Sequence, residues 1–369
     1  MRHVYLAATG QNRGKTTVSL GVLDGFQRRG LSASFLKPVG QRTIIEDGVP
    51  ADEDAVLMKQ VFGLPEPLGQ MSPVHIPRGF TQSYIEGDVV EDLPARIRAA
   101  HRAFADRDIL LIEGTGHAGV GAVIGLSNAT VAAMLGAPAV IVSEGGVGRP
   151  IDEIVLNAAL FERHGVKVAG AIVNKVDLDV KPGLADTLER GLALHGIPLL
   201  GVLPYRPILS NPTLAMVLEG VHGETIHAGP DLDQVIGGIA IGAMEPEHML
   251  ERIGPRSLVI VPGDRTDVIG AIVEDRLASG DDTDRDGALG LVLTGGYRPE
   301  RAVLDAIRAA DLFATLVPED TYQVASELHD LLIKTHPADA GKIAEIKELL
   351  WKYLFIDRVL AVAEEARLD

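Results

Sequence analysis

The sequence has no cysteine among its 369 residues. We therefore expect no disulfide, no thiolate metal site and no cysteine nucleophile, and we exclude amide transfer from glutamine for this chain. Aromatic residues make up 4% of the chain and hydrophobic residues 46%, which predicts globular domains with aliphatic cores. Basic residues are outnumbered, with 34 Lys and Arg against 51 Asp and Glu and a net charge of -17. This charge argues against nucleic acid and anionic membranes as partners.

Long apolar runs are also missing from the sequence. No window approaches the roughly 20 apolar residues that span a bilayer. The opening segment MRHVYLAATG does not contain the apolar stretch of a signal peptide. We therefore expect a cytoplasmic protein.

Short apolar runs alternate with helix-like stretches in the N-terminal part of the chain. The runs cover residues 3–9, 32–39, 108–114, 138–144, 168–174 and 198–204. Their unbroken hydrophobicity is typical of parallel strands that are covered on both faces. This alternation predicts an α/β fold, with a doubly wound, mostly parallel sheet in a P-loop NTPase domain at residues 1–215. A further series of strands and helices predicts a smaller α/β domain with C-terminal helices at residues 216–369.

The segment ATGQNRGKTT, at residues 8–17, resembles a phosphate-binding loop between a strand and a helix. Backbone N–H groups and the helix dipole would bind phosphate there, and Lys15 would add a point charge. Thr9 stands where the common pattern G-x-x-x-x-G-K-[ST] begins with glycine. The alternative is a glycine-containing turn that only packs well. The predicted nucleotide-binding residues of this segment are Thr9, Gly10, Gln11, Asn12, Arg13, Gly14, Lys15, Thr16 and Thr17.

A magnesium site would need more oxygen ligands than the hydroxyl of Thr16. Glu113 ends the apolar run DILLIEG, and Asp54 lies in the acidic segment ADEDA. Both are candidate ligands beside Thr16. The alternatives are a solvated strand end for Glu113 and a helix cap or dipole complement for Asp54.

Two further strand ends carry polar residues that point to the same edge of the sheet. The segment VNKVD contains Asn174 and Asp177, a pattern with which many GTPases bind guanine, although a polar turn would read the same way. Lys37, in FLKPVGQ, follows the second predicted strand. Alone it could equally be a solvated charge.

Together these residues resemble dethiobiotin synthetase, an ATP- and magnesium-dependent carboxylase. The shared features are ATGQNRGKTT, KPVG, DEDA, SPVHIP, IEGTGH, Asn174 and GVLPY, over residues 1–210. The resemblance implies that Lys15 and Lys37 are catalytic and hold the transferred phosphate. It also implies that Thr16, Asp54 and Glu113 bind Mg²⁺, and that Asn174 and the Pro204 segment receive the base. Related synthetases tolerate a loop that lacks the first glycine, and they act as homodimers.

The second domain resembles the DRTGG domain. Its motif residues would be Asp264, Arg265, Thr266 and Asp267, then Thr294, Gly295 and Gly296. The alternative is an ion pair that caps a helix, followed by a glycine turn. A synthetase-like domain followed by DRTGG resembles the N-terminal half of long-form phosphate acetyltransferases. The acetyl-transferring domain has no counterpart in this sequence, so we do not expect acetyl transfer.

The sequence supports a regulatory module that binds ATP or GTP with Mg²⁺, hydrolyses it slowly and acts on a partner such as a separate phosphate acetyltransferase. The alternative is an ATP-dependent carboxylase or ligase with an unknown small substrate, of the dethiobiotin synthetase and cobyrinic acid diamide synthase type. After KPV the chain has Gly40, Gln41 and Arg42, where dethiobiotin synthetases carry small and hydroxyl residues that contact substrate. A structural domain with vestigial nucleotide binding is the third hypothesis.

Overall fold

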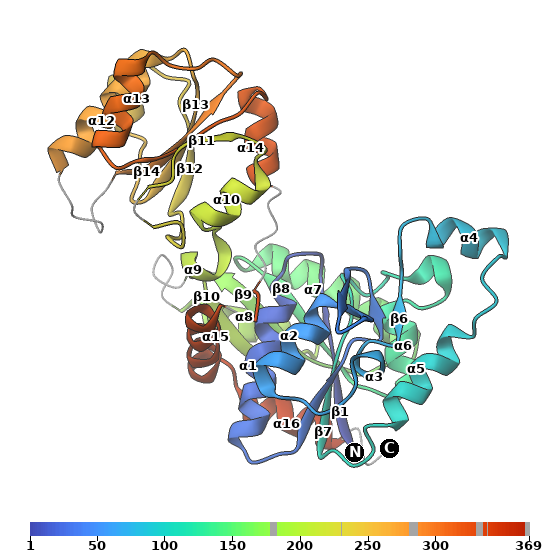
Figure 1. Ribbon diagram of the computed structural model, residues 1–369. Helices are drawn as coiled ribbons and strands as arrows, with labels where there is room; N and C mark the ends of the chain where they lie inside the picture. The colour runs from blue at the N-terminus through green and yellow to red at the C-terminus, as the bar shows by residue number, and fades with distance from the viewer. Residues whose placement is uncertain (178–182, 230, 280–286, 330–334, 338, 366–369) are drawn as a thin grey trace. The chain divides into compact units, whose positions relative to one another are not determined.

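The computed structural model describes residues 1–177, 183–229, 231–279, 287–329, 335–337 and 339–365. The chain forms two compact units (Figure 1). Unit 1 comprises Met1–Tyr205 and Thr335–Asp369, and unit 2 comprises Arg206–Lys334. The chain therefore leaves unit 1, forms unit 2 and returns to unit 1.

Unit 1 is built on a six-stranded sheet in which all neighbouring strands are parallel, in the order β10-β9-β8-β1-β7-β2. This confirms the predicted parallel sheet. Its strands are β1 (Arg2–Ala8), β2 (Ala33–Leu36), β7 (Ile109–Glu113), β8 (Ala139–Glu144), β9 (Val168–Val176) and β10 (Leu199–Pro204). Nearly all of their side chains are buried, which explains why they read as continuous apolar runs.

Helices surround this sheet and begin at identifiable caps. Asp52 caps α2 and Asp92 caps α5 by accepting hydrogen bonds from backbone N–H groups of the first turn, and Ser127 does the same for α6. The helices of this part of unit 1 are α1 (Lys15–Arg28), α2 (Glu53–Phe62), α3 (Leu68–Met71), α4 (Phe80–Glu86), α5 (Leu93–Arg102), η1 (Ala122–Ile124), α6 (Asn128–Leu135), α7 (Gly148–Arg163) and α8 (Leu184–Ala193).

Two small sheets extend the region that follows β2. In the first, β3 (Val39–Gly40) pairs with β6 (Val74–His75) in parallel. In the second, β4 (Thr43–Glu46) and β5 (Val49–Asp52) form an antiparallel hairpin. The hairpin is mostly exposed, and Ile45 is 68% exposed. The sequence reading did not predict these strands, because they are short and bury little apolar surface.

The C-terminal helices α15 (Ala340–Tyr353) and α16 (Ile356–Glu365) pack on unit 1, whereas the sequence reading placed them with the second domain. In Figure 1 α15 lies beside α1. Close packing is possible because α1 carries glycines at the contact. A Cβ atom on Gly21 would lie 2.2 Å from Cδ2 of Leu350, and one on Gly25 would lie 2.7 Å from Cγ1 of Ile356. The segment between the two helices also bonds to the edge strand β10, where Phe355 N–H donates to Leu200 O at 2.8 Å.

Unit 2 is a mixed sheet with helices on both faces. The strand order is β11-β15-β14-β13-β12, with β11 antiparallel to β15 and the other pairs parallel. Its strands are β11 (Glu224–His227), β12 (Gly238–Ile241), β13 (Ser257–Pro262), β14 (Ala288–Thr294) and β15 (Phe313–Leu316). Its helices are α9 (Pro207–Ser210), α10 (Leu214–Gly220), α11 (Pro246–Leu250), α12 (Thr266–Ser279), α13 (Arg301–Ala309) and α14 (Thr321–His329). One core lies between the sheet and α11, α12 and α13, and a second lies between the sheet and α10 and α14.

Among the described residues, no helix is both long enough and apolar enough to cross a bilayer.

Candidate functional site

The loop between β1 and α1 has the backbone of a phosphate-binding turn. Gly14 is the N-cap of α1 with a φ of 86°, in the left-handed region that favours glycine. The first N–H groups of α1, which has 14 residues, therefore lie next to the loop and are suited to bind an anion. Lys15 and Thr16 begin the helix. Within the described part of the chain, the Lys15 ammonium has no hydrogen-bond or ion-pair partner.

The end of β9 holds this loop in place. Asn174 donates from Nδ2 to the carbonyl of Arg13 at 3.1 Å, and Lys175 donates from Nζ to the carbonyl of Asn12 at 2.9 Å. A Cβ atom on Gly14 would lie 2.1 Å from Nδ2 of Asn174, so this contact requires glycine. The hydrogen bonds from Asn174 and Lys175 thus hold the phosphate loop in the observed conformation.

Thr9 and Arg13 attach the loop to α7 and the end of β8. Thr9 donates from Oγ1 to Oε2 of Glu153 at 2.8 Å and lies 3.1 Å from Oγ of Ser143. Arg13 forms ion pairs with Glu144 and Glu153. The hydroxyl that distinguishes Thr9 from the usual glycine therefore anchors the loop to a helix.

The other predicted loop and base residues lie around the same edge. Gln11 and Asn12 are exposed, whereas Gly10 and Thr17 are half-buried. Pro204 is buried at the end of β10 and pairs with Val176 of β9. Asp177 directly follows β9 and is exposed.

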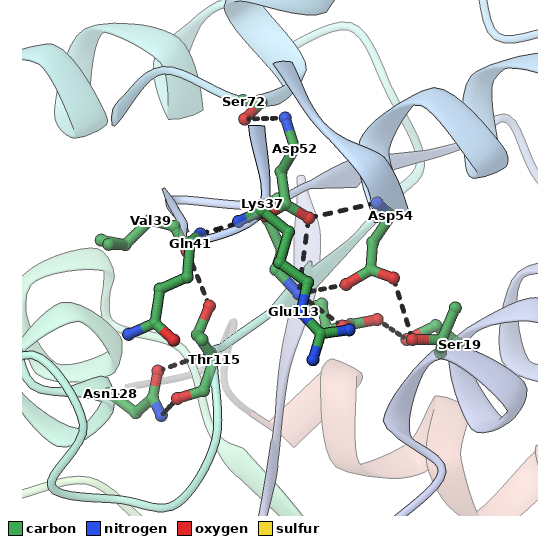
Figure 2. Close-up of polar contacts among 12 residues, drawn as sticks. Ser19, Lys37, Val39, Gln41, Asp52, Asp54, Ser72, Glu113, Thr115 and Asn128 are labelled. Atoms are coloured by element: carbon green, nitrogen blue, oxygen red, sulfur yellow. Dashed lines mark hydrogen bonds and ion pairs between the residues drawn. The ribbon is translucent and has the colours of Figure 1, made fainter. Parts of the chain in front are cut away.

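Lys37 lies at the centre of a buried charge cluster (Figure 2). Its side chain is 4% exposed. Nζ lies 2.5 Å from Oδ2 of Asp54, 2.7 Å from Oε1 of Glu113 and 3.9 Å from Oδ1 of Asp52. The predicted Lys37, Asp54 and Glu113 are therefore brought together, and none of them is a solvated surface charge.

The two carboxylates of this cluster have further hydrogen-bond donors. Asp54 accepts from Thr16 Oγ1 at 2.9 Å, and Glu113 accepts from Ser19 Oγ at 2.6 Å. Asp52, not Asp54, caps α2, because Oδ1 of Asp52 accepts from the N–H of Asp54 at 3.1 Å. The side chain of Asp54 is thus directed to Lys37 and Thr16.

Burial and charge shift the pKa values of this cluster in different directions. Burial alone would lower the pKa of Lys37, but Asp54, Glu113 and Asp52 outweigh it and hold the pKa well above its usual value. Burial raises the pKa of Glu113 to about 7, partly offset by Lys37. Burial, with the nearby charge of Lys37, lowers the pKa of Lys15 to about 8. An anion beside Lys15 would favour its protonated form.

Oxygen donors that could hold Mg²⁺ lie at the start of α1 and in the first turn of α2. Thr16 and Asp54 place a hydroxyl and a carboxylate 2.9 Å apart at the start of the phosphate loop helix, which fits a hard cation. Among the described residues, no group of three or more His, Asp or Glu side chains is arranged to hold a metal. A magnesium ion here would therefore rely on phosphate and water for its remaining ligands, and Glu113 could join only if it released Lys37.

The DRTGG-like motif residues of unit 2 meet at the ends of β13 and β14. Gly263 N–H donates to Thr294 O at 3.0 Å, and the N–H groups of Gly295 and Gly296 donate to Glu319 O and Val317 O. Arg265 pairs with Asp267 at 2.9 Å rather than with Asp264. The two halves of the motif are thus in contact through backbone bonds that shape these turns.

Sequence reasoning missed several side chains at the site of unit 1. Ser19, Asp52, Glu144 and Glu153 all contact residues that were predicted. Glu144 ends an apolar run, as Glu113 does, and the same signal could have identified it. Glu153 lies in the first half of α7, and no sequence signal placed it near the loop.

Comparison with curated proteins finds phosphate acetyltransferases. The chain is 29% identical over 352 residues to that of Pseudomonas putida, covering 90% of this chain and 47% of that protein. It is 25% identical over 344 residues to that of Nitrosomonas europaea, covering 89% and 47%. The chain thus spans about half the length of the curated relatives it matches.

Solved structures show more distant likenesses. The septum site-determining protein MinD from Pyrococcus horikoshii, complexed with Mg-ADP, aligns with a TM-score of 0.36 and 16% identity, covering 56% of this chain and 83% of that chain. The CBS and DRTGG domains of the regulatory region of Clostridium perfringens pyrophosphatase align with a TM-score of 0.27 and 16% identity, covering 38% and 60%.

Family models match both parts of the chain. The model of an AAA domain, AAA_26, matches residues 2–213, and the model of the DRTGG domain matches residues 216–331. These matches, with the acetyltransferase relatives, confirm the resemblance read from the sequence. The first match covers more than half of the chain, and this protein therefore belongs to the AAA_26 family of AAA domains and carries a DRTGG domain after it.

Proposed function

We propose that unit 1 binds a nucleoside triphosphate, ATP or GTP, together with Mg²⁺, and hydrolyses it slowly. The observation that carries this proposal is the unpaired Lys15 next to the Thr16–Asp54 pair, at the start of α1. A lysine without a carboxylate partner beside free helix N–H groups attracts phosphate. The adjacent oxygen pair suits the metal that accompanies a triphosphate.

The residues of unit 1 would have the following roles in nucleotide binding and hydrolysis. Loop N–H groups and Lys15 would hold the phosphates, and Thr16 and Asp54 would hold Mg²⁺, with Glu113 as a further candidate. When bound, Mg²⁺ would neutralise charge on the phosphates. Lys37, whose ammonium now contacts Asp54 and Glu113, would stabilise negative charge on the terminal phosphate. Asn174 and Lys175 keep the loop in register, and the base would lie near Asp177 and Pro204.

We further propose that the chain is a regulatory module of cytoplasmic enzymes, related to the N-terminal region of phosphate acetyltransferases. Support comes from the pairing of an AAA_26 domain with a DRTGG domain and from relatives with that name. Under this proposal, nucleotide occupancy is passed to a separate phosphate acetyltransferase or another enzyme. The chain would act as a homodimer.

A second function is favoured by one observation, the complete set of Lys15, Lys37, Thr16, Asp54 and Glu113 at one edge of the sheet. An ATP-dependent carboxylase or ligase would use this set to activate a small carboxylate or carbamate by phosphorylation. A module that only senses nucleotide does not need Lys37 for chemistry.

Nucleotide titration tests the first proposal. We expect purified protein to bind ATP or GTP only with Mg²⁺ present, and Lys15→Ala to weaken binding by about a hundredfold through loss of a phosphate contact. Exposed Lys167 of the same unit provides the matched control, Lys167→Ala, which should bind normally. Unchanged binding in Lys15→Ala would remove the site assignment. ADP formation that rises severalfold with an added small carboxylate or amine would favour the ligase.

A further inference from the structure

Arg42 has a half-buried side chain that takes no part in the charge cluster described above. It lies between β3 and β4, and its backbone is held on both sides. Its N–H donates to Oδ2 of Asp52 at 3.3 Å, and its carbonyl accepts from the N–H of Glu53 at 3.0 Å. Within the part of the chain that the structure describes, the guanidinium has no hydrogen-bond or ion-pair partner.

Short contacts connect Arg42 to the phosphate loop. Asp52 binds the backbone of Arg42 with Oδ2, and its Oδ1 lies 3.9 Å from Nζ of Lys37. Lys37 contacts Asp54, whose other oxygen accepts from Thr16. The backbone of Arg42 is therefore anchored to the same charge cluster that contacts Thr16 of the loop.

Among the described residues, the carboxylates of this cluster form no ion pair with Arg42 or Lys15. Asp54 and Glu113 are both within 2.7 Å of Lys37, and Asp52 is used by Lys37 and by three backbone N–H groups. Burial and then Lys37 lower the pKa of Lys15 most, Glu113 and Asp54 oppose them, and Arg42 adds a smaller lowering contribution. Two cationic groups that form no ion pair, close to a phosphate-binding turn, are suited to an anion that carries more than one negative charge.

We propose that the guanidinium of Arg42 binds the terminal phosphate of a nucleoside triphosphate and makes the site distinguish triphosphate from diphosphate. This inference rests on the proposed nucleotide binding by unit 1. Lys15 and the loop N–H groups would serve the phosphates at the start of α1, and Arg42, anchored to the Lys37 cluster through Asp52, would contact the terminal phosphate. A planar guanidinium can bind two phosphate oxygens at once, which a lysine cannot do.

The position of Arg42 next to β4 also couples binding of the terminal phosphate to the β4–β5 hairpin. Arg42 directly precedes β4. Its carbonyl accepts a hydrogen bond from the N–H of Glu53, and this bond closes the base of the β4–β5 hairpin. An anion that fixes Arg42 therefore restrains the hairpin. We expect the amides of residues 43–52 to exchange more slowly with a triphosphate bound than with a diphosphate bound.

The experiment measures the affinities of two nucleotides, each with Mg²⁺, by calorimetry on the full chain. The ligands are a non-hydrolysable triphosphate and the matching diphosphate of whichever base binds. The variants are Arg42→Gln, Arg42→Lys and, as the control, Arg98→Gln on the exposed face of α5. We expect Arg42→Gln to weaken the triphosphate about tenfold or more and the diphosphate less than about twofold, since one charged phosphate contact is lost. Arg42→Lys should lose less, and Arg98→Gln should change neither affinity.

Two results overturn the assignment while leaving nucleotide binding intact. They are an equal loss for both nucleotides in both Arg42 variants, and no loss for either nucleotide. Thermal unfolding of each variant identifies misfolding. If Arg42→Gln is misfolded, the triphosphate and diphosphate affinities of Arg42→Lys are compared in the same way. If the unmodified protein binds neither nucleotide, the proposed function itself fails, and this inference fails with it.

Discussion

At Lys37 a single ammonium group contacts three carboxylates, which come from the start of α2 and the end of β7. Asp52 precedes α2, Asp54 lies in its first turn and Glu113 ends β7. The sequence could indicate that Lys37, Asp54 and Glu113 lie at one edge of the sheet, because carboxyl ends of parallel strands meet there. It could not indicate which oxygen bonds to which donor, since that depends on side-chain conformations set by the packed fold.

Lys37→Met tests the energetic weight of this cluster. The change removes the charge and keeps a chain of similar length, so buried carboxylates lose their counter-charge. We expect the free energy of unfolding to fall by about 3 to 5 kcal/mol, as for other buried pairs from which one partner is removed. Urea unfolding measures the loss. Exposed Lys167→Met is the control and should change stability by less than about 0.5 kcal/mol.

The stability of Lys37→Met with and without Mg²⁺ tests whether Lys37 acts as the counter-charge of these carboxylates. If Lys37 balances the charge of these carboxylates, Mg²⁺ should stabilise the variant more than the unmodified protein, because the freed oxygens gain a cation. A variant as stable as Lys167→Met would mean that the ion pairs do not hold this region together.

At the scale of elements, the six strands of unit 1 could be predicted from the sequence because each is buried on both faces. The β4–β5 hairpin could not be predicted, because its exposed residues give no periodic apolar signal. C-terminal helices were expected from the sequence, and Ile343, Ile346, Leu349 and Leu350 are buried in α15. Its packing partner could not be predicted, since the groove on α1 comes from glycines, which in a sequence only weaken a helix.

Gly21→Ala tests this helix contact. The added Cβ would lie 2.2 Å from Leu350, too close for any unshifted packing, so α15 must move. We expect a loss of about 1 to 3 kcal/mol in the free energy of unfolding, as for other overpacked sites. Hydrogen exchange should show faster exchange in α15.

Gly270→Ala in α12 provides the matched control. Nothing lies within 4 Å of a Cβ atom at Gly270, so this change should stabilise the helix by up to about 1 kcal/mol. Leu350→Ala combined with Gly21→Ala should restore part of the lost helix contact. Equal behaviour of the two glycine variants would contradict close packing at Gly21.

At the scale of the molecule, unit 1 is assembled from two separate stretches of chain. Length and composition predicted two domains, and the βα series located the second one. They could not predict the return of the chain, because a linear pattern of strands and helices does not specify which unit a later helix contacts. Contacts distant in sequence, such as Arg29 with Asp357 at 2.8 Å, are tertiary facts.

A chain that ends at residue 334 tests this assembly. It lacks α15 and α16 and exposes the surface of α1 and the edge of β10 that they cover. Loss of several buried aliphatic side chains, at about 1.5 to 3 kcal/mol each, approaches the whole stability of a typical domain. Calorimetry and hydrogen exchange should show unit 1 unfolding at much lower temperature, with the exchange of unit 2 unchanged. Intact protection of unit 1 in this shortened chain would contradict the assembly.

The ion pair between Arg2 in β1 and Glu364 in α16, at 2.8 Å, joins the first strand of unit 1 to its last helix. Unit 2, encoded between them, has its own two cores. During synthesis the ribosome must therefore finish unit 2 before the residues that complete unit 1 emerge. The unit whose strand begins the chain is the last to close, and the later-encoded unit is free to fold first, the reverse of the usual order for domains arranged in series.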